Sequence, residues 1–229
     1  MTIDSCAKSS LKRTFTALAG ICLLLAPVTP ASARPACDER SISDARSLPL
    51  GTQVTVDGTV STPSGAFASS FFDVGFGLQD HEAGIYVSVQ TDPHLVPGDR
   101  VHVSGVLGDS FGLLVLIPNA ATDVARLGHA RPPLPELERT GSIGETTEGL
   151  LVAVKARVTQ GPTSDLPYGY KFTVDDGSGA LQIFVNIPTG IDLSPLSLGQ
   201  KVKITGFSSP FADHYEIDPR SPNDLVLLR

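Results

Sequence analysis

The chain has 229 residues, of which 17 are Lys or Arg and 24 are Asp or Glu, giving a formal net charge of −7. With this net charge the protein as a whole is not attracted to the phosphate backbone of a nucleic acid, as a basic protein would be. Any binding of nucleic acid must therefore depend on local charge.

The first 33 residues have the pattern of a secretory signal peptide. Basic residues precede an apolar run over residues 15–28, and Ala31 and Ala33 have the A-x-A spacing that signal peptidase requires. The run is too short to span about 30 Å of hydrocarbon comfortably, which argues against a transmembrane anchor. We predict cleavage after Ala33, a secreted or periplasmic location, and no membrane segment afterwards. Removing 33 of the 229 residues leaves 196, which suits two small domains or one large one.

Cys6 and Cys22 belong to this predicted signal, so Cys37 is the one cysteine of the mature chain. An internal disulfide is therefore excluded, although the compartment would allow one. We expect Cys37 to be a free thiol near the new N-terminus or, alternatively, an intermolecular link.

The mature chain repeats itself. FGLQDHEAGIYVSVQ, residues 76–90, matches FTVDDGSGALQIFVN, residues 172–186, without gaps at an offset of 96. Three further pairs of segments match in order, at offsets of 98, 101 and 101, and begin at Gly51 and Gly149, at Leu95 and Leu196, and at Thr122 and Asn223. Collinear matches with small changes of offset predict a duplicated domain of roughly 90 residues, with loops that absorb the differences.

Each copy of the repeat is predicted to be nearly all β. Its segments are short, rich in Val, Ile, Thr and Phe, and bounded by Gly, Pro, Asp and Ser. Apolar and polar residues alternate, as in residues 151–158, which indicates strands with one buried face. Five strands per copy, with a crossover between the third and the fourth, predict two tandem five-stranded OB-fold-like Greek-key barrels. The alternative is a β-sandwich.

We place the first OB-fold-like domain at residues 34–128, a linker at 129–147 and the second domain at 148–229. The linker is rich in proline near its start, which favours a stiff strap that runs over the surface. The crossovers of both copies are too short and too rich in Pro for more than one turn of helix. A single helical turn is expected over residues 42–48.

These strand-and-turn motifs resemble the OB-fold modules of secreted bacterial endonucleases. The resemblance is carried by LPLGTQVTVDGTV, FGLQD, AGIYV, VPGDRVHVSGVL and TDVARLG in the first copy and by TTEGLLVAV at the start of the second. In that family such modules precede a separate catalytic domain and are described as nucleic-acid-binding. The resemblance implies a binding module without the catalytic domain.

The sequence contains no catalytic motif: no G-x-S-x-G, and no cysteine in the folded part to pair with a histidine. We therefore expect no enzymatic activity and no cofactor, and at most an accessory role beside a separate nuclease. Asp80 and Asp176 lie where hairpins turn, and we interpret them as Asx-type turn residues. Gly105 and Gly206 follow matching strands and are expected to supply a bulge or a bend.

One polar cluster has residue types that bind metals. His214, Glu216 and Asp218 alternate along a presumed strand and so share one face, and such a set of N and O ligands could hold a divalent cation. The first copy carries Leu114, Leu116 and Pro118 thereabouts. We interpret the cluster as the polar outer face of an exposed strand and as only a weak candidate for a metal site.

The strongest candidate for a binding surface is a group of cations in the second copy. Strand parity places Lys155 and Arg157 on the outer face of the first strand. Lys201 and Lys203 lie by the same argument on the outer face of the fourth strand, which neighbours the first in an OB-fold barrel.

Lys171 on the second strand and an outward Phe184 on the third are expected beside these cations. Cations next to an outward aromatic ring are how OB-folds hold single-stranded DNA or RNA. The first copy offers a thinner version of the same surface, made of Tyr86, Arg100 and His102. Two alternatives remain: the cations keep a small β domain soluble, or the chain is a cell-envelope module that binds a protein or an oligosaccharide.

Overall fold

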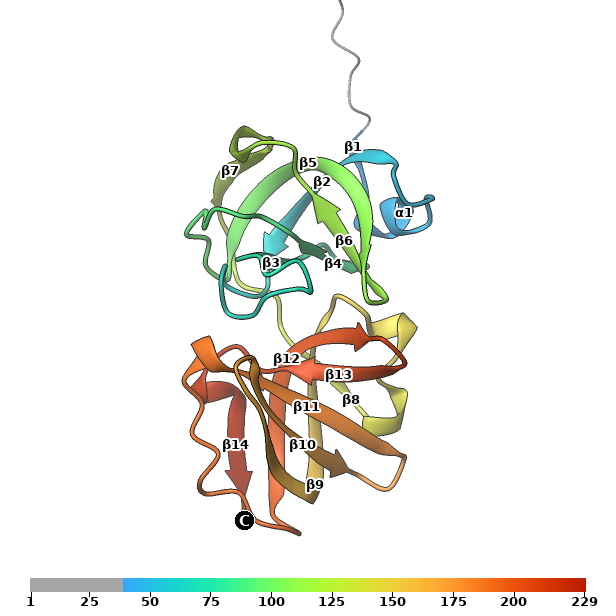
Figure 1. Cartoon of the computed structure of the whole chain (residues 1–229). Helices are drawn as coiled ribbons and strands as arrows, with labels where there is room; N and C mark the ends of the chain where they lie inside the picture. Colours follow the sequence, from blue (N-terminus) through green and yellow to red (C-terminus); the bar gives the residue numbers. More distant parts are fainter. Residues whose placement is uncertain (1–38) are drawn as a thin grey trace, which may run out of the picture. The chain divides into compact units, whose positions relative to one another are not determined.

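The computed structural model of the protein describes residues 39–229 (Figure 1). The predicted signal peptide, its cleavage site and Cys37 lie outside the described residues. No helix within residues 39–229 combines the length and the apolar character needed to cross a membrane.

Both copies of the repeat are built almost entirely of strands. The first copy consists of β1 (Glu39–Arg40), α1 (Ile42–Arg46), β2 (Gln53–Val60), β3 (Phe76–Gln79), β4 (Gly84–Val87), β5 (Asp99–Ser110), β6 (Leu113–Ile117), η1 (Ala121–Asp123) and β7 (Val124–His129). The second consists of β8 (Glu136–Glu138), η2 (Thr140–Ser142), η3 (Glu145–Thr147), β9 (Leu151–Asp165), β10 (Gly169–Asp175), β11 (Ala180–Asn186), η4 (Ile187–Thr189), β12 (Lys201–Phe211), β13 (His214–Asp218), η5 (Pro222–Asp224) and β14 (Leu225–Leu228). The elements marked η are short 3₁₀ turns, and α1 is the predicted helical turn, capped by the side chain of Ser41.

The two sheets have the same strand order. It is β1-β2-β3-β4-β6-β5-β7 in the first copy and β8-β9-β10-β11-β13-β12-β14 in the second, and pairing of β2 with β5 and of β9 with β12 closes each barrel. β4 and β6 run parallel, as do β11 and β13, whereas the other barrel neighbours are antiparallel. A five-stranded Greek-key barrel of this order is an OB-fold. The fold prediction is confirmed, and the β-sandwich alternative is wrong.

The duplication extends to the register of the strands. β5 pairs with β6 from Val106 opposite Ile117 to Ser110 opposite Leu113. β12 pairs with β13 over the equivalent positions, each 101 residues later. The counterparts of His214, Glu216 and Asp218 are therefore Leu113, Val115 and Ile117. Each lies one residue before the position expected from the sequence.

The structure adds a short strand in front of each barrel that the sequence pattern does not predict. β1 pairs in parallel with β2, placing Glu39 opposite Thr55. β8 pairs in parallel with β9, placing Glu136 opposite Val152. The Pro-rich linker is thus a strap that contributes an edge strand to the second sheet once its prolines have passed.

Asp80 and Asp176 are Asx-type turn residues, as predicted. The backbone N–H groups two positions later donate to their Oδ1 atoms, at 2.8 and 2.9 Å. Each carboxylate also holds the strap in front of its barrel. Asp80 accepts from the N–H of Ile42 at 2.8 Å, and Asp176 accepts from the hydroxyl of Thr140 at 2.9 Å.

Gly105 and Gly206 lie where β5 and β12 bend from one partner strand to the next. The strand register continues through both positions without a shift. The predicted bend is therefore present, whereas the alternative prediction of a bulge is wrong. A Cβ at position 105 would lie 2.7 Å from the backbone of Ile117, and one at position 206 would lie 2.4 Å from the carbonyl oxygen of Asp218. Only glycine allows the strands to approach this closely.

Each barrel encloses its own apolar core, made of the alternating residues of its strands. The first core includes Val54, Val56, Phe76, Leu78, Val101 and Val103. The second includes Val152, Val154, Phe172, Val174, Ile183 and Ile204. The remaining face of every strand is therefore free to meet solvent, a ligand or the other barrel.

A third apolar cluster joins the two barrels, which belong to one compact unit. The ring centroid of Phe207 on β12 lies 5.3 Å from that of Phe67 and 6.0 Å from that of Tyr86. A Cβ at Gly84 would lie 1.9 Å from the carbonyl oxygen of Gly149, so only glycine fits there. The second barrel therefore covers the outer face of β4.

Candidate functional site

Four cations lie together on the outer face of the second barrel. They are called the cation group below and comprise Lys155, Arg157, Lys201 and Lys203. In the antiparallel pair of β9 and β12, Lys203 lies opposite Lys155, and Lys201 lies opposite Arg157. Lys203 is half-buried and the other three are exposed.

The cation group places like charges directly opposite each other, which destabilises a sheet. The equivalent wall of the first barrel has no like-charged pair. There Asp57 lies opposite His102, and the Asp57 Oδ1 atom is 2.6 Å from the His102 Nδ1 atom. Arg100 lies opposite the uncharged Thr59. The two copies share a fold but differ in charge at three of these four positions, since Arg100 keeps the positive charge of Lys201, so the fold does not require the cation group.

A shallow hollow of about 400 Å³ lies beside the cation group. It is lined by Lys155, Ala156, Arg157, Asp175, Asp176, Gly177, Lys201 and Leu228. The hydroxyl of Ser178, and after it that of Thr140, donates to Asp176 and lowers its pKa to about 2, so this carboxylate is ionised at neutral pH. An acidic edge therefore bounds the cation group on the side of β10.

Lys171 and Phe184 lie opposite each other on β10 and β11, away from the cation group. Along β10, Asp175 is the residue opposite Arg157, and Lys171 is four residues away. That is about 13 Å along a strand. The Nζ atom of Lys171 also lies 3.3 Å from Asp165 in an ion pair. The expectation that these two residues adjoin the four cations is therefore wrong, although their outward direction is as predicted.

Tyr86 is not the outward stacking residue expected in the first copy. Its side chain has no exposed surface, and its hydroxyl donates to Asp73 Oδ1 at 2.7 Å. Burial raises the pKa of this phenol well above its ordinary value. Strand parity does direct Tyr86 out of its own barrel, but Phe67 and Phe207 cover it there. Arg100 remains exposed.

His214, Glu216 and Asp218 share one face of β13, but that face is not exposed as expected. Glu216 and Asp218 are 6% and 4% exposed. Gln182 donates to Glu216 at 2.7 Å, and burial raises the pKa of Glu216 to about 7. Burial also raises the pKa of Asp218, which accepts from Ser209. Among residues 39–229, no group of three or more His, Cys, Asp or Glu side chains is arranged to hold a metal ion.

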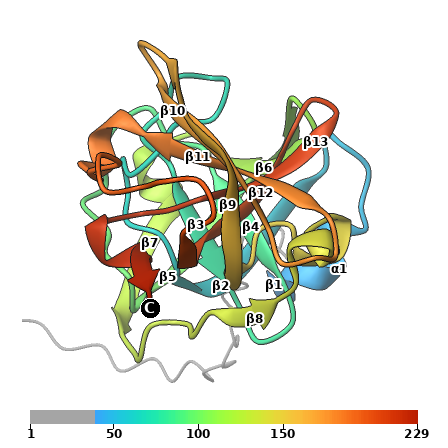
Figure 2. The same ribbon diagram turned by 90° about the horizontal axis from the view of Figure 1, so that it is seen from below.

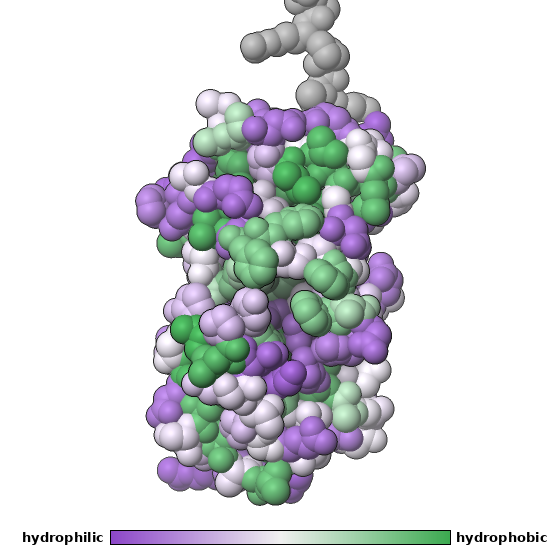
Figure 3. Space-filling view, viewed as in Figure 1, coloured by the Kyte–Doolittle hydropathy of each residue, from purple (hydrophilic) through white to green (hydrophobic). Residues whose placement is uncertain are grey.

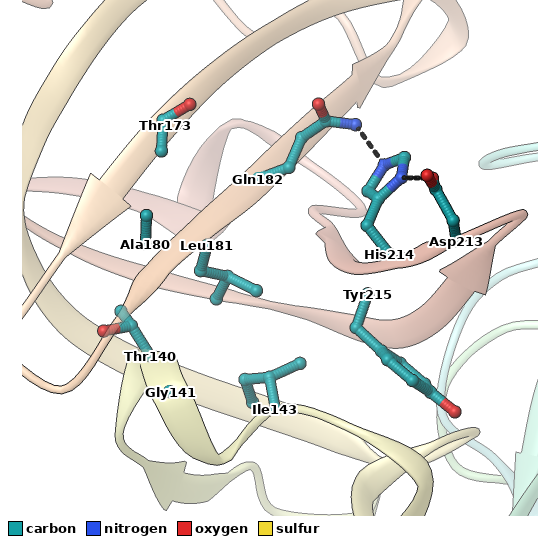
Figure 4. Close-up of a pocket in the computed structure, with 10 residues that line it drawn as sticks. All are labelled: Thr140, Gly141, Ile143, Thr173, Ala180, Leu181, Gln182, Asp213, His214 and Tyr215. Carbon is teal, nitrogen blue, oxygen red and sulfur yellow. Dashed lines mark hydrogen bonds and ion pairs between the residues drawn. The ribbon is translucent and has the colours of Figure 1, made fainter.

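A groove of about 490 Å³ opens on the second barrel near these residues (Figure 4). It is lined by Thr140, Gly141, Ile143, Thr173, Ala180, Leu181, Gln182, Asp213, His214 and Tyr215. In Figure 4, Gln182, His214 and Asp213 form one rim, joined by hydrogen bonds, and Thr140 and Gly141 of the strap lie away from it. The described residues that line this groove include no lysine or arginine.

Aromatic residues reach the surface at the hairpin tips. The β9–β10 and β12–β13 hairpins project from the second barrel (Figure 2), and apolar residues are mixed with hydrophilic ones on the face in Figure 3. Phe211, on the β12–β13 hairpin, stacks on Phe111 with 5.6 Å between ring centroids. The rings of Phe72 and Tyr168 form a tilted pair with 6.1 Å between their centroids. Phe72 and Phe111 have φ of 54° and 53°, which costs energy in any residue but glycine.

The strand order and the surfaces described above define the chain as a tandem OB-fold protein. No family model matches it. In sequence it is similar to Endonuclease YhcR of Bacillus subtilis (strain 168), with 29% identity over 203 residues. The match covers 85% of this chain but 16% of that protein, so the chain spans about a sixth of its relative's length. The predicted resemblance to a bacterial endonuclease is confirmed.

Solved structures that are similar to this chain include two with low sequence identity. A murine DNA-binding protein bound with double-stranded DNA has 13% identity and a TM-score of 0.41, covering 76% of this chain and 96% of that one. The OB domain of MM0293 from Methanosarcina mazei has 16% identity and a TM-score of 0.36, covering 42% and 86%. Because these TM-scores are below 0.5, the fold assignment rests on the strand order.

Proposed function

We propose that the chain is a non-catalytic binding protein that holds single-stranded nucleic acid on the cation group of its second barrel. The observation that carries this proposal is the two like-charged cross-strand pairs between β9 and β12. Such pairs cost stability in the free protein, and an anionic ligand offsets that cost. The N-terminal signal pattern supports a site of action outside the cytoplasm.

The four cations would each contact a phosphate, and Phe184 with Lys171 would provide a second contact for the same strand. Lys171 lies about 13 Å along β10 from the residue opposite Arg157, and an extended oligonucleotide of a few nucleotides can span that length, so one strand can reach both positions. A base stacked on Phe184 would add an attraction that salt does not screen. The similarity to part of an endonuclease supports an accessory role, in which the chain presents nucleic acid to a nuclease.

Salt dependence tests the proposal. Fluorescence anisotropy with a labelled oligo-dT should give a log–log slope of affinity against salt of about −2.8 for four neutralised phosphates. The double variant Lys155→Gln/Lys203→Gln should reduce the slope to about −1.4. The matched control, Arg40→Gln/Arg131→Gln, removes two exposed cations outside every candidate binding surface and should keep the slope.

Two results would refute the proposal. One is the absence of binding by the mature chain at about 20–50 mM salt, where attraction is least screened. The other is an equal loss of slope in the control variant, which would mean that the oligonucleotide responds only to net charge. In either case the alternative of an envelope module that binds a protein or an oligosaccharide becomes the better explanation.

A further inference from the structure

We infer that the groove of Figure 4 is a second binding site, which takes a neutral carbohydrate at Gln182, His214 and Asp213. The aromatic ring of Phe211, which neighbours that of His214, would add a contact beside the groove. This site is separate from the cation group, and the inference does not rest on the nucleic-acid proposal. It rests on the difference between the two copies, on a fixed hydrogen-bond network and on the charge of the groove.

The same face is apolar in one copy and polar in the other. Gln182, His214 and Glu216 occupy the positions that Tyr86, Leu113 and Val115 occupy in the first copy. The apolar set of the first copy is buried in the cluster between the barrels. Because the barrel folds with apolar residues here, the polar set is not needed for the fold. Its partial burial costs energy, which a ligand-binding role would explain.

The polar groups at the rim are held in one arrangement by their hydrogen bonds. The amide nitrogen of Gln182 donates to Glu216 Oε2 at 2.7 Å and lies 2.8 Å from His214 Nε2. This assigns the acceptor role to Nε2 of His214 and the proton to Nδ1, which lies 3.3 Å from Asp213 Oδ1. The amide oxygen of Gln182 and the carboxylate of Asp213, whose side chain is 97% exposed, remain able to accept. Oriented acceptors of this kind suit ligand hydroxyl groups.

Charge selects the class of ligand. The groove has no lysine or arginine among its described lining residues and has the carboxylate of Asp213 at its rim, so it repels a phosphate. A sugar ring carries no charge, and its hydroxyl groups donate to carboxylate and amide oxygens. The volume of about 490 Å³ lies within the usual range for ligand sites.

The hairpin next to the groove supplies an aromatic platform. Phe211 is 49% exposed, and its ring forms a T-shaped pair with that of His214, with 6.1 Å between ring centroids. Phe111 supports its other side at 5.6 Å. An exposed aromatic ring beside fixed polar groups can pack on the apolar face of a pyranose while its hydroxyl groups are hydrogen-bonded. OB-folds bind oligosaccharides with the second and third strands and adjacent loops, and the groove uses elements of this kind.

The test is a titration followed by ¹H–¹⁵N NMR on the full mature chain. The probes are three neutral tetrasaccharides: of β-1,4-linked glucose, α-1,4-linked glucose and β-1,4-linked N-acetylglucosamine. At least one should shift the side-chain amide of Gln182 saturably, and its affinity should change less than about twofold over a tenfold range of salt, because no ion is displaced. Phe211→Ala and Asp213→Asn should each weaken binding by about fivefold or more, as expected for an aromatic or charged hydrogen-bonding contact.

Both variants change exposed side chains, and dispersed NMR spectra would establish that they fold. Lys155→Gln is the matched control, because it lies in the cation group and should bind the sugar as the wild type does. The inference is overturned if none of the three tetrasaccharides shifts the groove residues at millimolar concentration. It is equally overturned if Asp213→Asn and Phe211→Ala bind unchanged, or if the oligo-dT shifts these residues and the sugars do not.

Discussion

The buried carboxyl group of Glu216 should make the protein less stable as the pH rises. Its pKa is about 7, against an ordinary value of 4.5, because burial disfavours the charged form. Below pH 4.5 the group is protonated in both the folded and the unfolded chain. Between pH 4.5 and 7 the unfolded chain gives up the proton and the folded chain keeps it, so the free energy of unfolding falls with pH.

The size of the effect follows from the difference between the two pKa values. At about 1.4 kcal/mol for each pKa unit, the free energy of unfolding should be about 3 kcal/mol lower at pH 8 than at pH 4.5. Burial also raises the pKa values of Asp218 and Glu148, which therefore act in the same direction. The pKa of Asp176 is lowered to about 2, so the stabilisation that its ionised form contributes is already complete at pH 4.5 and does not change between pH 4.5 and pH 8.

Urea unfolding followed by circular dichroism measures the effect. With an m-value of about 2–3 kcal/mol/M, the midpoint of the wild type should fall by about 1 M between pH 5 and pH 8. Glu216→Gln keeps a side chain that can accept from Gln182 and has no charge to bury, so its midpoint should change much less. Glu136→Gln, an exposed residue of β8, is the control and should behave as the wild type does.

The reasoning fails if the wild-type midpoint is the same or higher at pH 8. It also fails if Glu216→Gln shows as large a fall as the wild type, because the dependence would then come from other groups. The urea midpoint of the control variant Glu136→Gln should fall with pH as much as that of the wild type, because Glu136 is exposed.

Three further predictions concern the surface and the N-terminus. Lys155→Gln should raise the free energy of unfolding by about 0.2–1 kcal/mol, because it removes a like-charged cross-strand pair; a lower urea midpoint would contradict this. Phe184→Ala should weaken oligo-dT binding by about 1–3 kcal/mol with the salt slope unchanged, since stacking releases no counterions; anisotropy across a salt series measures both quantities. The secreted protein should begin at Arg34, and a mass that includes residue 33 would refute the predicted cleavage.

The fold could be predicted because its signals are local. Alternation of apolar and polar residues, turn residues at the strand ends and the duplication itself all appear in the sequence. β1 and β8 could not be predicted, since two or three residues are too few to show an alternation. The position of Lys171 along β10 relative to the residues of β9 also depends on register shifts between these two strands, and no local sequence pattern predicts such shifts.

The sequence predicts which way the side chains of the candidate site point, but not whether they are exposed to solvent. Strand parity places Tyr86, Glu216 and Asp218 on the outside of their barrels, as observed. Whether the outside meets water depends on what packs there, and one of the two rings that cover Tyr86 is that of Phe207, which is remote in the sequence. The groove is also lined by Thr140 of the strap. Thr140 is held there by a hydrogen bond to Asp176, which no sequence motif predicts.

The two copies have specialised in different ways. In the first barrel the outer residue Tyr86 packs on the second barrel, and the opposing wall pairs Asp57 with His102, so both surfaces are satisfied within the protein. In the second barrel the equivalent wall carries Lys155 opposite Lys203, and the equivalent face opens into a groove. Costs of this kind persist where a ligand offsets them. We therefore propose that the first barrel serves mainly as a support for the second, on which the cation group and the groove lie.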